Sequence, residues 1–182
     1  MMSHKTLRMM LLSALFAALT AVGAFIRLPA GPTSITLQFF FSALAGILLG
    51  GKWGAVSQLL YVGLGLLGLP VFTMGGGLSY LLQPSFGFLL GLIPSTAVIA
   101  ALTHRSASRP RLFLGCLLGD LVLYLFGVPY MYLISHVYGG SATTWMAMWA
   151  SMLVFVPGDL IKLVVLTALS PILQRRLGKY IQ

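Results

Sequence analysis

The sequence predicts an all-α polytopic membrane protein with six transmembrane helices. Hydrophobic residues make up 59% of the 182 residues and charged residues only 7%, whereas soluble domains carry roughly 25% charged residues. The mean hydropathy is +1.00. This length holds about six apolar spans of ~20 residues and leaves no stretch for a separate soluble domain. Any ATP-hydrolysing unit would therefore lie on another chain.

The basic residues collect at the ends of the expected spans. If the N-terminus is cytoplasmic, only Arg27 faces outward and Lys162 lies within a span, whereas nine basic residues face inward: Lys5, Arg8, Lys52, Arg105, Arg109, Arg111, Arg175, Arg176 and Lys179. This asymmetry predicts an even number of spans and cytoplasmic termini. The net charge of +9 does not indicate nucleic-acid binding, because these residues do not share one face.

The first span is expected at about 7–26. The basic residues before it resemble a signal peptide, but the apolar run is long enough to cross and is needed for orientation, so we expect it to be retained. Ala14, Ala17, Ala18 and Ala21 form two interleaved small-xxx-small pairs. Such pairs let helices approach closely, which serves either docking of a partner subunit or packing within the chain.

The remaining spans are expected at about 35–50, 53–69, 85–102, 112–135 and 157–176. Pro84 and Pro157 support the starts of the fourth and sixth spans. Residues 143–155 are predicted to form a separate short interfacial helix, because Trp145 and Trp149 fit an aromatic belt. The sole cysteine, Cys116, excludes an intrachain disulfide and is expected to be a packing residue.

The outer loops carry candidate binding residues. The segment 68–84 is too long and glycine-rich for a tight turn, so we expect it to fold back as a lid or re-entrant segment. It contains Phe72, Tyr80 and Gln83, and the preceding outer loop ends in Gln38. These side chains would either surround a ligand with an apolar body and a few hydrogen bonds, or anchor the loops at the interface.

The only two acidic residues, Asp120 and Asp159, lie inside apolar stretches. Asp159 and Lys162 are three residues apart and share one helical face, and ionisable groups within a membrane are costly and usually functional. Asp159 also suits the first turn of a helix. The pair would either bind a small polar ligand beneath the outer loops or form only a mutual ion pair and helix cap.

Asp120 is expected ~12 Å from the cytoplasmic end and Lys162 ~21 Å from the same side. This difference in depth disfavours a direct ion pair between them, although long side chains could narrow the gap. An interhelical contact and a role in the site both remain open. No Walker motif, GxSxG elbow or HExxH helix is present, and the three histidines have no metal-like spacing. We therefore expect no catalytic residues, metal or cofactor.

Several stretches resemble the biotin-specific S components of energy-coupling-factor transporters, the BioY family. The likeness covers nearly the whole chain, and its most specific blocks are GLPVF followed by GGG, and PGDLIK. It extends over Ile35–Phe72, Phe72–Gly91, Tyr124–Tyr130 and Phe155–Lys162. The resemblance implies the six-helix S-component fold, biotin bound near the outer face, and a location in the bacterial cytoplasmic membrane.

The resemblance also implies docking through the first helix onto a transmembrane T subunit that couples to two ATPases. Asp159 and Lys162 match the family's polar pair in the last helix. The ureido ring of biotin suits a carboxylate, and its valerate suits Lys162 or Arg27; which end meets which charge stays open. The expected binding set is Asp159, Lys162, Gln83, Tyr80, Phe72, Ser85, Arg27 and Gln38.

The chain departs from the family at the head of the fourth helix. The usual Gly-Pro-Thr-Gly-Gly-Tyr is here Gln83, Pro84, Ser85, Phe86, Gly87 and Phe88, so the detailed pocket shape differs. Three alternatives follow: an S component for another vitamin, a small membrane enzyme using Asp159 and Lys162 as acid and base, or a purely structural subunit. The enzyme alternative lacks support because no nucleophile and no set of metal ligands accompanies Asp159 and Lys162.

Overall fold

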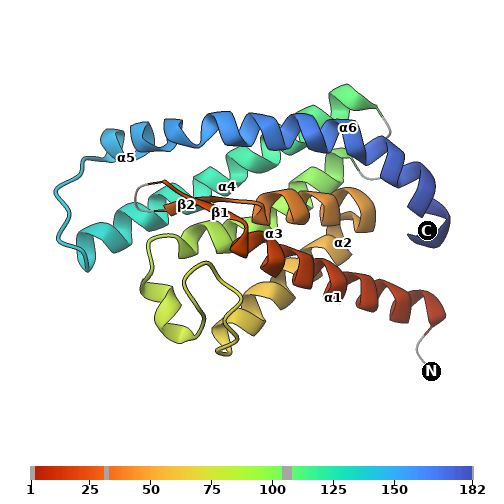
Figure 1. The fold of residues 1–182 in the computed structure, drawn as a ribbon, viewed down its shortest axis with the longest axis horizontal. Helices are drawn as coiled ribbons and strands as arrows, with labels where there is room; N and C mark the ends of the chain where they lie inside the picture. The colour runs from red at the N-terminus through yellow and green to blue at the C-terminus, as the bar shows by residue number, and fades with distance from the viewer. Residues whose placement is uncertain (1–2, 31–32, 104–107, 182) are drawn as a thin grey trace.

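The computed structural model describes residues 3–30, 33–103 and 108–181. It is a bundle of helices running roughly along one long axis, with both termini at the same end (Figure 1). Five helices are long and apolar enough to cross a membrane: α1 (His4–Phe25), α2 (Gln38–Leu66), α3 (Phe86–Thr103), α4 (Arg109–Val137) and α6 (Val156–Ile181). The predicted all-α class is confirmed.

Helix α2 contains two of the expected spans, folded back on each other at Gly50. This residue has φ 83° and ψ 175°, a conformation that glycine adopts without a steric cost. The fold-back is shown by a hydrogen bond of 2.7 Å between Gln38 Nε2 and Tyr61 Oη, which a straight helix would place about 34 Å apart. The bundle therefore has six helical passes.

The connections at the end opposite the termini are more structured than expected. The first holds a two-stranded antiparallel hairpin, β1 (Arg27–Ala30) and β2 (Thr33–Thr36), with Arg27 opposite Thr36. The sequence had given no indication of strands here. Residues 67–85, called the outer loop below, hold the short helix η1 (Leu78–Leu82). The separate short helix after the fifth span is α5 (Trp145–Ser151), continued by η2 (Met152–Val154).

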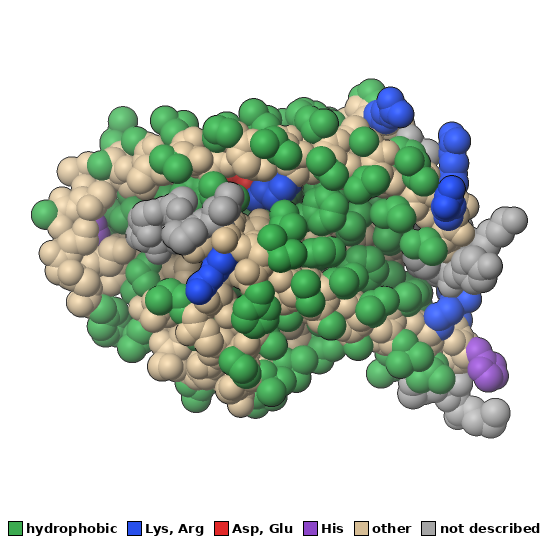
Figure 2. Space-filling model, viewed as in Figure 1, with side chains coloured by type: hydrophobic (Ala, Val, Ile, Leu, Met, Phe, Trp, Pro, Cys, Tyr) green, Lys and Arg blue, Asp and Glu red, His purple; other side chains and the backbone are tan. Residues whose placement is uncertain are grey.

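The first leg of α2 forms the centre of the bundle. Phe39, Ala43 and Ile47 are buried in the main apolar cluster, because α1, α3 and α6 pack around this leg. Large apolar side chains are exposed on the outer faces of the helices (Figure 2). This is the arrangement required where lipid surrounds a bundle.

The alanine pairs of α1 face in different directions. Ala17 is buried and Ala21 packs partly against the interior, whereas Ala14 and Ala18 are exposed. One pair thus packs within the chain and the other is available on the surface.

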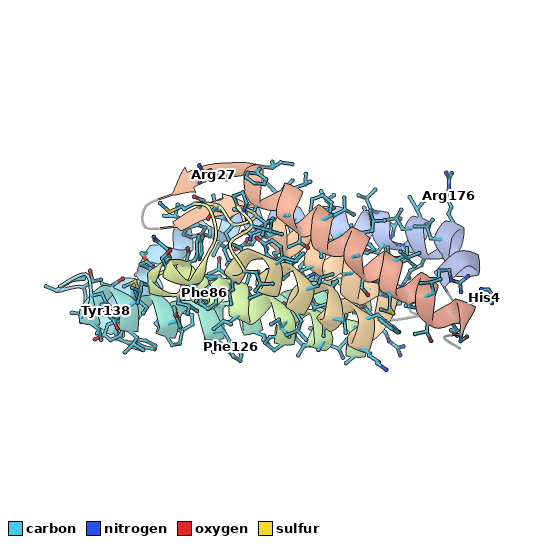
Figure 3. All side chains as sticks on the ribbon, turned by 90° about the horizontal axis from the view of Figure 1, so that it is seen from below. His4, Arg27, Phe86, Phe126, Tyr138 and Arg176 are labelled. Atoms are coloured by element: carbon cyan, nitrogen blue, oxygen red, sulfur yellow. The ribbon has the colours of Figure 1, made fainter. Side chains whose placement is uncertain are left out.

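Basic side chains gather at the end that carries the termini (Figure 2). His4 and Arg176 mark this end, and Arg27 and Tyr138 lie toward the other (Figure 3). Arg105, one of the nine residues expected on the cytoplasmic side, lies outside the described residues.

Candidate functional site

A cavity opens beneath the outer connections, between the β-hairpin, α2, α3, α4 and α6. Its apolar wall consists of Phe39, Phe88, Leu89, Leu92, Leu123, Met152 and Phe155. Its polar wall consists of Ser34, Thr36, Gln38, Thr73, Tyr80, Ser85, Tyr124, Asp159 and Lys162.

The charged pair of α6 lies at this wall. Asp159 is in the first turn of the helix, and one turn later Lys162 places Nζ 2.5 Å from Asp159 Oδ1. The two residues are only 8% and 9% exposed. Lys162 Nζ also donates a hydrogen bond of 3.4 Å to the Thr36 carbonyl oxygen. The pair therefore presents a hydrogen-bond acceptor and a donor side by side in a dry setting, where polar interactions are strengthened.

Tyr124 of α4 completes the surroundings of the carboxylate. Its hydroxyl donates to Asp159 Oδ2 at 2.5 Å, and its ring packs edge-on against Phe88 with centroids 5.9 Å apart. Each carboxylate oxygen thus holds one donor from the protein. Because a carboxylate offers about four acceptor positions, acceptor capacity remains for N–H groups of a ligand.

Gln38 lies beside this pair at the start of α2. Its Oε1 accepts a hydrogen bond of 2.9 Å from the Thr36 hydroxyl, and its Nε2 donates one of 2.7 Å to the Tyr61 hydroxyl. These two bonds fix the orientation of the amide. Since an amide nitrogen carries two hydrogens, one donor remains for a ligand.

A second polar region consists of hydroxyl groups supplied by the outer loop. The hydroxyls of Thr73 and Tyr80 are 2.8 Å apart, and Tyr80 Oη lies 3.5 Å from Ser85 Oγ. Arg27 of β1 donates from Nη1 to the Thr73 carbonyl oxygen. The hairpin and the outer loop therefore meet over the cavity, and hydroxyl groups face the space below.

The structure brings together five of the eight expected binding residues: Asp159, Lys162, Gln38, Tyr80 and Ser85 all line the cavity. The other three are absent from the wall. Phe72 is wholly buried, with its ring centroid 5.5 Å from that of Tyr61 and 4.6 Å from that of Tyr80. Its ring packs among other aromatic rings and therefore supports the outer loop from within.

Gln83 and Arg27 also lie away from the cavity wall. Gln83 follows η1, where its backbone N–H bonds to the Tyr80 carbonyl oxygen, and it turns the chain toward α3. Arg27 is exposed and bonds to the outer loop instead.

Eleven of the sixteen lining residues were not in the expected set, and Tyr124 and Phe88 are the most informative of them. Tyr124 is separated from Asp159 by 35 residues, so no local pattern joins them; the available signal was a phenol within an apolar span, where a buried hydroxyl needs a partner. Phe88, noted only as a departure from the family, lies in the apolar wall. Phe86, the other departure, is buried between Tyr80 and Tyr130.

Asp120 is not part of the cavity wall. It is 7% exposed, and its Oδ1 has no hydrogen-bond partner among the described residues. The direct ion pair between Asp120 and Lys162, which their expected depths disfavoured, is not formed.

Fold and cavity together define a polytopic membrane protein with a buried, charged site for a small molecule with polar groups. The model of the BioY family matches residues 1–179. The chain belongs to the BioY family, which confirms the resemblance stated above.

Similar proteins agree with the assignment to the BioY family. The chain is 42% identical to a probable biotin transporter BioY of Lysinibacillus sphaericus over 80% of this chain and 75% of that one. It is 37% identical to the biotin transporter BioY of Thermotoga maritima over 67% and 73%. These relatives are transporters rather than enzymes.

A solved structure matches the whole bundle. The crystal structure of the S-component for biotin from an ECF-type ABC transporter superposes with a TM-score of 0.82 at 26% identity. The match covers 96% of this chain and 95% of that one. The predicted S-component fold is therefore confirmed.

Proposed function

We propose that this protein captures biotin as the substrate-binding subunit of a vitamin uptake transporter. The observation that carries the proposal is the cavity itself, whose lining includes the adjacent Asp159 and Lys162 and the hydroxyls of Thr73, Tyr80 and Ser85. Apolar side chains make up much of the remaining lining. A molecule with an apolar body and several polar groups fits this pattern.

The chemistry of biotin suits both polar regions. Its ureido ring presents N–H donors next to a carbonyl acceptor, which is the complement of a carboxylate next to an ammonium. Asp159 would accept the N–H groups while Lys162 donates to the carbonyl oxygen. The valerate would lie away from Asp159, since two anions repel each other, and would accept hydrogen bonds from Tyr80 and Ser85.

Transport would require further subunits. We propose that a transmembrane T subunit and two ATPases energise release, because the described residues form a helical bundle and include no nucleotide-hydrolysing domain. The exposed pair Ala14 and Ala18 would form part of the contact with the T subunit, since small residues let helices approach closely.

The same proposal gives the protein a place in the cell. We place it in the cytoplasmic membrane with both termini in the cytoplasm, because the basic side chains gather at the end with the termini (Figure 2) and follow the positive-inside rule. The cavity then faces outward, where the vitamin is captured. No cofactor is needed for this role.

Equilibrium binding to the purified protein in detergent tests the proposal. Radiolabelled biotin should bind at one site per chain and should be displaced by excess unlabelled biotin. Desthiobiotin, riboflavin and thiamin should serve as competitors, because Phe86 and Phe88 depart from the family pattern. Stronger displacement by riboflavin or thiamin than by biotin would indicate another vitamin, and no binding of any of them would indicate a structural subunit.

A further inference from the structure

Tyr61 of α2 lies outside the cavity wall and bonds both to the cavity and to the outer loop. Its side chain is 1% exposed. Its hydroxyl accepts a hydrogen bond of 2.7 Å from Gln38 Nε2 and donates one of 3.1 Å to the Val71 carbonyl oxygen. Gln38 lines the cavity and Val71 belongs to the outer loop. One phenol hydroxyl therefore joins a wall residue to the loop above it.

The direction of these bonds is fixed by chemistry. A hydroxyl has one hydrogen to donate, and the Val71 carbonyl oxygen can only accept it. Tyr61 must therefore accept from Gln38, which requires the NH₂ end of the amide to face it. The opposite end of the amide accepts from Thr36 at 2.9 Å, and the Thr36 carbonyl oxygen accepts from Lys162. A continuous series of hydrogen bonds thus leads from the charged pair to the outer loop.

The ring of Tyr61 also supports the loop. It packs edge-on against Phe72 with centroids 5.5 Å apart, and Phe72 is wholly buried. Beyond Phe72, the Gly77 N–H bonds to the Gly65 carbonyl oxygen at 2.7 Å. The loop carries Thr73 and Tyr80 into the cavity wall, so opening it would remove part of the wall and free Tyr61 from Val71.

We propose that Tyr61 is a positioning residue that links ligand capture to closure of the outer loop. Tyr61 holds the Gln38 amide so that the second N–H of this amide is available to the ligand. The Tyr61 hydroxyl donates to the Val71 carbonyl oxygen only when the loop is closed. A ligand that bonds to Gln38 therefore favours the closed loop. The role in capture rests on the proposed function, whereas the role in holding the loop does not.

The first experiment uses the ligand-free, full-length protein in detergent. Tyr61→Phe keeps the ring and removes both hydrogen bonds of the hydroxyl. Because a hydrogen bond contributes up to about tenfold in an equilibrium constant, we expect hydrogen exchange in peptides covering residues 69–83 to accelerate roughly tenfold. Tyr132→Phe is the matched control: its ring packs against His136 and Trp145, and its loop exchange should stay at the wild-type rate.

The second experiment measures biotin kinetics by stopped flow. Tyr61→Phe should raise the dissociation rate roughly tenfold while changing the association rate less than about threefold. Gln38→Met should weaken binding but keep the loop protected in the ligand-free protein, because Tyr61 still bonds to Val71. If thermal unfolding shows that Tyr61→Phe does not fold, Gln38→Met still tests the inference.

Two results would overturn the inference: wild-type loop exchange in folded Tyr61→Phe, or loss of loop protection in folded Gln38→Met. Absence of biotin binding by wild-type protein would instead reject the proposed function. The two failures are distinguishable because the exchange experiment contains no ligand.

Discussion

Replacing Asp159 with asparagine removes one charge and keeps the shape of the side chain. In the wild type, Asp159 Oδ1 lies 2.5 Å from Lys162 Nζ, and Oδ2 accepts from Tyr124 at 2.5 Å. The substitution leaves an ammonium group that is 9% exposed with the Thr36 carbonyl oxygen at 3.4 Å and the Phe39 ring at 5.8 Å. Breaking a buried ion pair by removing one partner costs about 3–5 kcal/mol.

The effect on ligand binding is separate. If the carboxylate accepts ureido N–H groups, asparagine loses a charge-assisted hydrogen bond of about 1.5–3 kcal/mol. This corresponds to roughly 10- to 150-fold weaker biotin binding, measured by calorimetry on purified protein. Thermal unfolding on the same samples reports the loss of stability.

The double variant Asp159→Asn, Lys162→Met separates the two effects. It has no uncompensated ammonium, so it should be more stable than Asp159→Asn alone, yet it should still bind biotin weakly. A folded Asp159→Asn protein that binds biotin within about twofold of the wild type would refute the assigned role of the carboxylate.

Three further changes test other parts of the structure. Tyr124→Phe removes the donor to Asp159, and calorimetry should show biotin binding about three- to tenfold weaker; equal affinity would contradict a positioning role. Gly65→Ala would place a Cβ 2.0 Å from the Phe72 ring, so thermal unfolding should show a loss of about 1–3 kcal/mol, and unchanged stability would argue against this packing. Ala18→Leu should leave biotin binding intact but reduce co-purification with the T subunit, and full complex formation would exclude Ala18 from the contact.

The sequence predicted the helices well because the apolar spans are long and their ends carry clear signals. The expected span at 85–102 corresponds to Phe86–Thr103, and that at 157–176 to Val156–Ile181. The boundary between the second and third spans was expected at about 50–53, and the positive φ of Gly50 is the physical basis of the turn there. The hairpin at Arg27–Thr36 was missed because pairing of two four-residue strands leaves little periodicity to detect.

The site was predicted in part. Asp159 and Lys162 stood out because two charges three residues apart on one helix share a face. Tyr124 and Tyr61 did not, because their partners lie 35 and 23 residues away in the chain. Phe72 was expected at the ligand because aromatic residues in loops often bind ligands, but the aromatic neighbours that bury it come from α2 and η1.

An experimental structure of the purified protein with biotin would show whether the cavity is the biotin-binding site. We expect density for one biotin molecule in the cavity of each chain, with its ureido group within hydrogen-bonding distance of Asp159 and Lys162 and its valerate near Tyr80 and Ser85. An empty cavity at saturating biotin, or biotin bound elsewhere on the protein, would contradict it.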